Sequence, residues 1–312
     1  MLLLFVCSGT QGFSWGFYGH KLINFRAVFL LPPEMVVFYK KHIEFLKEHA
    51  VDPDKRRYAI EQEGPRHYID LDKYDVKALP KSWSKAVKKY SEDSLAAHGI
   101  VPWWIQVMLK RLTTAFKDND AMMILKMSAE LGHYVGDAHV PLHTSSNHNG
   151  QLTDQYGIHG FWESRIPEMY AENGWDLIAE RAHYLKNPLD YAWQTVYDSF
   201  AASDSVLTFE RMLNSRFSGD KKYAYENRNG LLIKQYSTQY AWEYNYMLDG
   251  MIERRLRQAI SGVASLWYTA WANAGKPDLK NLTGMQLDEH DKQQFEQLNN
   301  QWRSGQIKGR SC

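Results

Sequence analysis

Apolar residues recur at steps of three and four along most of this 312-residue chain, and this spacing places them on one face of an α-helix. The clearest case follows the pair Pro32–Pro33 and runs from Met35 to Leu46, since proline suits the start of a helix. The same spacing predicts helices over residues 103–116, 121–139, 175–184, 206–213, 233–271 and, in the polar tail, 289–302. We find no pair of alternating strands joined by a tight turn, no fixed repeat and no flexible linker. An all-α fold with a single multi-helix domain over residues 15–312 is therefore expected.

Charge and cysteine content narrow the classes of function. Lys and Arg total 37 against 36 Asp and Glu, so the chain lacks the basic excess typical of proteins that bind long duplex nucleic acid. Any contact with nucleic acid must be local. No apolar run approaches the roughly 20 residues of a membrane span, so we expect a soluble mature chain. With only Cys7 and Cys312 available, a bound metal must be held by histidines and carboxylates.

The N-terminus has features of an export signal. An apolar stretch from Leu2 to Val6 is followed by small residues, Gly12 and Ser14, at the positions that signal peptidase requires. We expect residues 1–14 to be a signal peptide that is cleaved before Trp15, so that the protein is periplasmic or secreted. The stretch is short and lacks basic residues at its start, so whether the start codon is correctly placed stays open. An uncleaved apolar end and lipidation at Cys7 are the alternatives, and bulky Val6 disfavours lipidation.

Histidines and carboxylates cluster between residues 133 and 163. Two pairs, His133 with Asp137 and His159 with Glu163, are spaced four residues apart and so share a helix face. Pro141 ends the first helix, which frees His143 to turn toward a neighbouring ion. One such pair on an exposed helix is usually only an ion pair. Two pairs that bracket a third histidine and a proline instead predict a zinc site of the catalytic type, with positions left open for water.

The motifs around these residues resemble a known superfamily, that of bacterial zinc-dependent phospholipase C and the fungal single-strand-specific zinc nucleases. The resemblance rests on four motifs in the same order: Trp15-Gly16-x2-Gly19-His20; His67-Tyr68-Ile69-Asp70, with Asp52 placed 15 residues before His67; His133-x3-Asp137-x-His139-x-Pro141-Leu142-His143; and His159-x2-Trp162-Glu163. It covers residues 15–163 and, more weakly, residues 254–271.

Carried over position by position, the resemblance implies three zinc ions. The first would be held by Asp52, His67, His133 and Asp137; the second by His143, His159 and Glu163; the third by Trp15, His20 and Asp137. Asp137 would bridge the first and third ions. Trp15 would bind through its free amino group and its carbonyl oxygen, so removal of the preceding residues would complete the site. His139 matches a family position and is expected to support a ligand by a hydrogen bond.

The resemblance also implies the reaction, which is hydrolysis of a phosphodiester by a zinc-bridging hydroxide. Asp137 and Asp52 would be the catalytic carboxylates, and whether Asp52 is a general base or only a ligand stays open. The residue identities within the motifs favour single-stranded nucleic acid or 3'-nucleotides as substrate. The 16-residue step from His143 to His159, and glutamate as the last ligand, instead favour phospholipase C acting on phosphatidylcholine-type head groups. A helical protein with structural zinc is the alternative from another class, and no protein partner is predicted.

Overall fold

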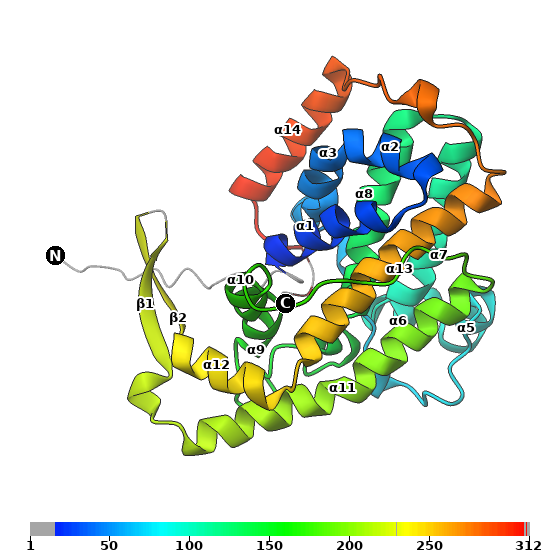
Figure 1. Cartoon of the computed structure of the whole chain (residues 1–312). Coiled ribbons are helices and arrows are strands. Elements are labelled where there is room, and N and C mark those ends of the chain that lie inside the picture. Colours follow the sequence, from blue (N-terminus) through cyan, green and yellow to red (C-terminus); the bar gives the residue numbers. More distant parts are fainter. Residues whose placement is uncertain (1–15, 229, 309, 311–312) are drawn as a thin grey trace.

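Helices dominate the computed structural model (Figure 1), which describes residues 16–228, 230–308 and 310. The α-helices are α1 (Gly16–Ala27), α2 (Pro33–Lys41), α3 (Ile43–Glu48), α4 (Asp52–Arg56), α5 (Trp83–Tyr90), α6 (Glu92–Ala97), α7 (Val101–Lys117), α8 (Ala121–Ala138), α9 (Ile158–Gly160), α10 (Ile166–Tyr170), α11 (Pro188–Arg216), α12 (Thr238–Met247), α13 (Met251–Asn273) and α14 (Glu289–Ser304). The short helical turns are η1 (Val28–Leu30), η2 (His49–Val51), η3 (Glu61–His67), η4 (Leu71–Lys73), η5 (Pro141–Thr144), η6 (Phe161–Arg165), η7 (Gly219–Lys221) and η8 (Lys280–Leu282), and η6 is a π-helix. The all-α prediction is confirmed. In the described part of the chain, no helix combines the length and apolar character needed to cross a membrane.

Several predicted helices coincide with observed ones. The segments 103–116 and 121–139 are α7 and α8, the segment 289–302 is α14, and 206–213 lies in the C-terminal part of the longer α11. Helix α8 ends at Ala138 with His139 as its C-cap, so the stop expected from Pro141 is observed.

The helix predicted over residues 175–184 is wrong, since this segment is irregular. Two of its backbone N–H groups bond to other segments instead of to their own turn. The amides of Ala182 and His183 donate to the Leu30 carbonyl at 3.0 Å and to Ser265 Oγ at 3.3 Å. Neighbouring elements therefore supply the partners that a helix would otherwise provide.

Two longer predictions are wrong in part. The segment 35–46 is divided at His42, whose φ of −110° and ψ of 24° lie outside the helical region. The segment 233–271 comprises the end of a strand, α12 and α13, and Gly250 separates the two helices with a left-handed φ of 69°. That conformation costs glycine little and other residues much.

One antiparallel β-hairpin is present where none was predicted. Strands β1 (Tyr223–Arg228) and β2 (Leu231–Tyr236) pair with Tyr223 opposite Tyr236 and Tyr225 opposite Lys234. Gly230 adopts the left-handed φ of 81° that a tight turn requires. Polar or charged residues fall on both sides of the two strands, so they lack the apolar alternation that marks a half-buried strand, and the sequence pattern did not reveal them.

Helix α8 lies in the centre of the helical body and contacts α1, α3, α7 and α13 (Figure 1). Gly132 allows α1 to approach it closely, because a Cβ there would lie 1.9 Å from Asn24 Oδ1. The Asn24 amide is in turn fixed, since its Nδ2 donates to the carbonyls of Leu46 and Ala129 at 3.0 and 3.1 Å. This contact sets the position of α1, and with it His20, relative to α8.

Replacement of Gly132 by Ala should destabilise the protein by about 1–3 kcal/mol, the usual cost of overpacking a core, even though alanine gains about 1 kcal/mol of helix propensity. Urea unfolding measures this change. Gly284→Ala is the control, since nothing lies within 4 Å of a Cβ at that position. Equal stability of the two variants would contradict the proposed close approach.

Candidate metal centre

The His133–Asp137 pair faces the centre of the molecule from α8, as its four-residue spacing predicts. Both side chains are fully buried. His133 Nε2 lies 3.2 Å from Asp137 Oδ2, and His67 Nδ1, from the end of η3, lies 3.0 Å from the same oxygen. The two imidazole nitrogens are themselves 3.0 Å apart. Three potential ligand atoms from two distant segments thus meet at one point, in an arrangement suited to holding a metal ion.

A second group forms where His143, His159 and Glu163 meet, and it is also buried. His159 Nε2 lies 3.0 Å from Glu163 Oε2 and 3.1 Å from His143 Nε2. His159 belongs to α9 and Glu163 to the π-helical η6. A π-helical turn is rare and often occurs at functional sites. Here it brings the carboxylate toward both imidazoles.

The orientation of the histidines shows what these groups can bind. The Nδ1–H groups of His133, His143 and His159 donate to the carbonyls of Ala50, His67 and His148 at 2.8, 2.6 and 2.9 Å. A carbonyl can only accept, so each Nε2 of a neutral ring presents a lone pair. Lone pairs that face one another and a carboxylate at about 3 Å repel unless a cation lies between them. The donor set therefore fits a divalent metal that accepts nitrogen and oxygen ligands, such as zinc.

His20 approaches the other oxygen of the same carboxylate. Its Nε2 lies 3.3 Å from Asp137 Oδ1, and its ring stacks on that of His133 with centroids 3.8 Å apart. Trp15 lies outside the described residues. The first described residue, Gly16, packs against η6, because a Cβ there would lie 2.5 Å from Ser164 Oγ. The chain thus begins its first helix beside Glu163.

Asp52 and Asp54 are both buried, but they have different surroundings. Asp52 accepts hydrogen bonds from His49 Nδ1 at 2.6 Å and from Lys55 Nζ at 2.9 Å. Asp54 Oδ1 lies 3.7 Å from both His67 Nδ1 and His133 Nε2. Neither Asp54 oxygen has a hydrogen-bond partner among the described residues. Buried carboxylates are normally paired, so Asp54 has the geometry of a ligand, while Asp52 faces away from the centre.

A further carboxylate that the sequence reasoning missed lies behind His67. Glu63 Oε1 is 3.6 Å from His67 Nε2, and Glu63 also accepts hydrogen bonds from Tyr134 and from Arg66 Nη1, the latter at 2.7 Å. A carboxylate placed behind a ligating histidine orients the ring and makes it a stronger ligand. The sequence does contain a signal for this contact, since Glu63 and His67 are four residues apart.

The pKa values of the central groups respond to the charges around them. Burial raises the pKa of the Asp137 carboxyl, but the neighbouring His133 and His143 outweigh it and lower that pKa well below its usual value. Burial lowers the pKa of His133, yet the charges of Asp137 and Asp54 raise it to about 9. The electrostatic field at this point therefore favours positive charge, as a cation site requires.

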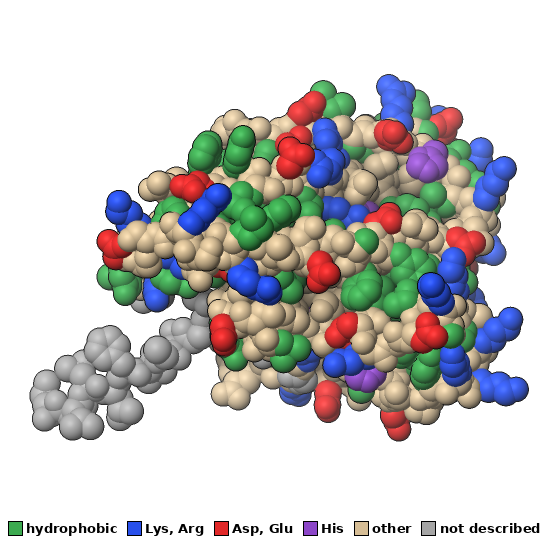
Figure 2. Space-filling view, turned by 90° about the horizontal axis from the view of Figure 1, so that it is seen from below, with side chains coloured by type: hydrophobic (Ala, Val, Ile, Leu, Met, Phe, Trp, Pro, Cys, Tyr) green, Lys and Arg blue, Asp and Glu red, His purple; other side chains and the backbone are tan. Residues whose placement is uncertain are grey.

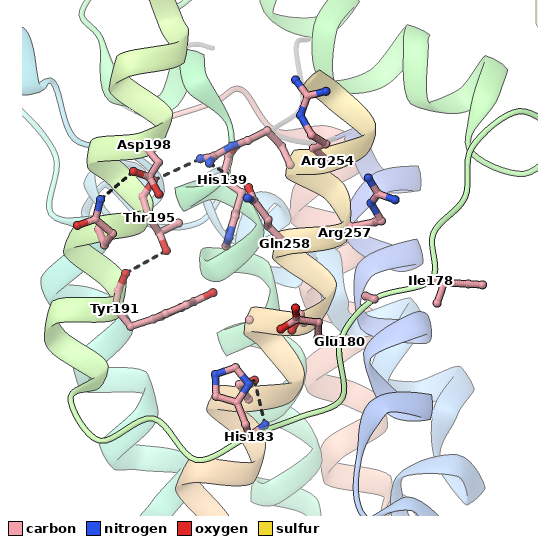
Figure 3. Close-up of a pocket in the computed structure, with 16 residues that line it drawn as sticks. His139, Ile178, Glu180, His183, Tyr191, Thr195, Asp198, Arg254, Arg257 and Gln258 are labelled. Carbon is pink, nitrogen blue, oxygen red and sulfur yellow. Dashed lines mark hydrogen bonds between the residues drawn. The ribbon is translucent and has the colours of Figure 1, made fainter. Parts of the chain in front are cut away.

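His139 lies off this centre and lines a separate pocket of about 570 Å³ between α11, α13 and the segment 178–183 (Figure 3). Its Nδ1–H donates to the Val135 carbonyl at 2.7 Å, and its own carbonyl accepts from Arg255 Nε at 2.9 Å. Burial and the charge of Arg255 lower its pKa to about 3. Neither bond joins it to a ligand side chain, so the supporting role predicted for it is not the one observed.

The surface charge is mixed on the face that Figure 2 shows, where basic and acidic side chains alternate, in keeping with the net charge of +1.

The model of the S1/P1 nuclease family matches residues 15–266 and thus most of the chain. A search of curated proteins gave no match. Members of this family are zinc-dependent hydrolases that act on phosphodiester bonds, and the clustered histidines and carboxylates supply ligands for that chemistry. The chain belongs to the S1/P1 nuclease family.

Proposed function

We propose that this protein hydrolyses phosphodiester bonds of single-stranded nucleic acid or nucleotides with three zinc ions. The observation that carries the proposal is the convergence of imidazole nitrogens on the buried Asp137 and Glu163 carboxylates. The first ion would be held by Asp54, His67, His133 and Asp137; the second by His143, His159 and Glu163; the third by Trp15, His20 and Asp137. Asp54 takes the place that the sequence analysis gave to Asp52, because only Asp54 faces His67 and His133.

Zinc supplies two things when bound, a water whose pKa falls to about 7 and positive charge to neutralise the phosphoryl oxygens. The protein contributes the positions of the ligands. Asp137 offers one oxygen to His67 and His133 and the other to His20, so it can bridge two ions. Asp52, held by His49 and Lys55 next to Asp54, supports the short helix α4 that presents Asp54.

We also propose that the chain forms one domain and is exported, with cleavage before Trp15. The contact of Gly16 with Ser164 supports this proposal, because a new amino terminus one residue earlier would begin close to Glu163. Packing of the tail helix α14 against α4 supports the single domain.

Asp54→Asn should lower kcat for bis-p-nitrophenyl phosphate by about 100-fold, since loss of one ligand charge weakens both the metal site and transition-state stabilisation. Asp52→Asn should lower it by less than about tenfold, because that side chain supports the site without touching it. Zinc content by mass spectrometry is the second readout. The assignment is wrong if Asp52→Asn loses metal and Asp54→Asn does not.

A protein that retains Ser14 in front of Trp15 should bind one zinc ion fewer than the protein that begins at Trp15, because an amide nitrogen cannot replace a free amine as ligand. Its activity on bis-p-nitrophenyl phosphate should fall by at least about tenfold. A matched protein that begins at Trp15, made by cleavage of a fusion, is the control. Identical zinc content and activity in the two forms would exclude Trp15 as a ligand.

The substrate is tested by assaying the Trp15-initiated protein side by side on single-stranded DNA, RNA, 3'-nucleotides and phosphatidylcholine vesicles. We expect kcat/KM for single-stranded DNA or RNA to exceed that for phosphatidylcholine by at least about 100-fold, a difference in activation free energy of about 2.7 kcal/mol. Phospholipase C is the second candidate, favoured by Glu163 and by the short step from His143 to His159. The opposite ratio would select it.

A further inference from the structure

The β-hairpin carries a face of exposed rings next to the metal centre, and we propose that single-stranded nucleic acid stacks its bases on this face as the strand leaves the site. The inference rests on the proposed nuclease function and adds the place where the substrate is held. Figure 1 shows the hairpin projecting from the helical body near α9 and α10. We call the side formed by Tyr223, Tyr225, Asn227, Leu232 and Lys234, with the buried Tyr236 at its inner end, the hairpin face.

The hairpin is joined directly to the segment that carries two candidate zinc ligands. Phe161, which lies between His159 and Glu163 in the sequence, stacks on Tyr236 of β2 with centroids 3.9 Å apart and an interplanar angle of 20°. Arg165 of η6 donates to both carboxylate oxygens of Glu226 of β1, with Nη1 at 3.1 Å from Oε2. A substrate bound on the hairpin is therefore held in a fixed relation to Glu163.

The rings continue outward from this junction. Tyr236 is followed by Tyr223, 5.1 Å away between centroids, and Lys234 Nζ lies 4.0 Å above the Tyr223 ring. Tyr225 lies two residues further along β1, about 6.6 Å away for a strand, and pairs with Lys234 across the hairpin. Its side chain is 68% exposed, and that of Leu232 is 71% exposed. A row of rings thus runs from the buried Phe161 to solvent.

The hairpin face carries a positive charge. Residues opposite one another in the register share a side, so Lys234 lies on the hairpin face, and none of the described residues of this face is acidic. Glu226 is on the other side, where Arg165 engages it. The hairpin face is therefore aromatic and locally positive in a chain whose net charge is only +1.

This chemistry matches a single strand of nucleic acid better than a lipid surface. Unpaired bases stack on aromatic rings, and one such contact changes affinity by roughly 5- to 150-fold, while a nearby cation attracts the phosphates. A loop that inserts into a membrane presents several aliphatic residues or tryptophans. On the hairpin face, Leu232 is the single aliphatic side chain among the described residues. Because the chain has nearly equal numbers of basic and acidic residues, we expected any contact with nucleic acid to be local. The hairpin face offers such a local contact.

The test compares Tyr225→Ala with the wild-type protein on two substrates. For an oligodeoxythymidylate of about 20 nucleotides, kcat/KM should fall by about tenfold, because KM rises while kcat stays the same. For bis-p-nitrophenyl phosphate, which is too small to reach the hairpin face, both constants should stay within about twofold of wild type. Tyr225→Trp keeps a ring and should restore the KM for the oligonucleotide. Tyr246→Ala, which removes a tyrosine that is 74% exposed on α12, is the matched control and should change neither substrate.

Each other result has a defined meaning. If Tyr225→Ala matches wild type on the oligonucleotide while both proteins cleave it, the hairpin inference is wrong and the proposed nuclease stands. If Tyr225→Ala and Tyr246→Ala weaken the KM equally, the effect is not specific to the hairpin face, and the inference is again wrong. If wild type cleaves no nucleic acid, but Tyr225→Ala reduces binding to phosphatidylcholine vesicles, the face serves a membrane and both proposals are overturned.

Discussion

The buried carboxylate of Asp137 is the constraint on which the rest of the structure depends. His67 and His133 approach one of its oxygens, and His20 approaches the other, at 3.0 to 3.3 Å. Imidazole nitrogens and a carboxylate, whose lone pairs repel one another, are thus assembled in the buried interior of the protein. Such an arrangement is favourable only around positive charge. The fold thus concentrates unfavourable electrostatics at a point where a bound metal ion would relieve them.

The same constraint explains why distant segments meet there. The Nδ1–H groups of His133, His143 and His159 bond to carbonyls of η2, η3 and the loop before α9. Each of these histidines is therefore anchored to a segment other than its own. A metal ion that binds these rings also ties together the segments that carry them, so metal binding and folding are coupled. The close approach of α1 to α8 at Gly132 extends this coupling to His20.

Much of the centre could be predicted because its main pairs lie four residues apart on helices. His133 with Asp137, and His159 with Glu163, meet as that spacing requires, and Pro141 releases His143 as expected. The choice between Asp52 and Asp54 could not be made from spacing alone. Residues two apart on a helix point to nearly opposite sides, so only one of them faces His67, and the entry angle of the short helix α4 decides which.

The parts of the fold that the sequence analysis missed depend on neighbours. The segment 175–184 has helical periodicity, yet its amides bond to Leu30 and Ser265 and no helix forms. The β-hairpin lacks apolar alternation because both of its sides carry polar or charged residues, and its position is set by Phe161 and Arg165 from η6. Tertiary contacts override local pattern in both cases.

The central claim is that these buried groups hold zinc at defined points. X-ray diffraction from crystals of the Trp15-initiated protein, recorded on both sides of the zinc absorption edge, tests it most directly. The account predicts three anomalous peaks: one among Asp54, His67, His133 and Asp137; one among His143, His159 and Glu163; and one beside His20 on the far oxygen of Asp137. The absence of peaks in the first two groups, or zinc bound elsewhere, would contradict it.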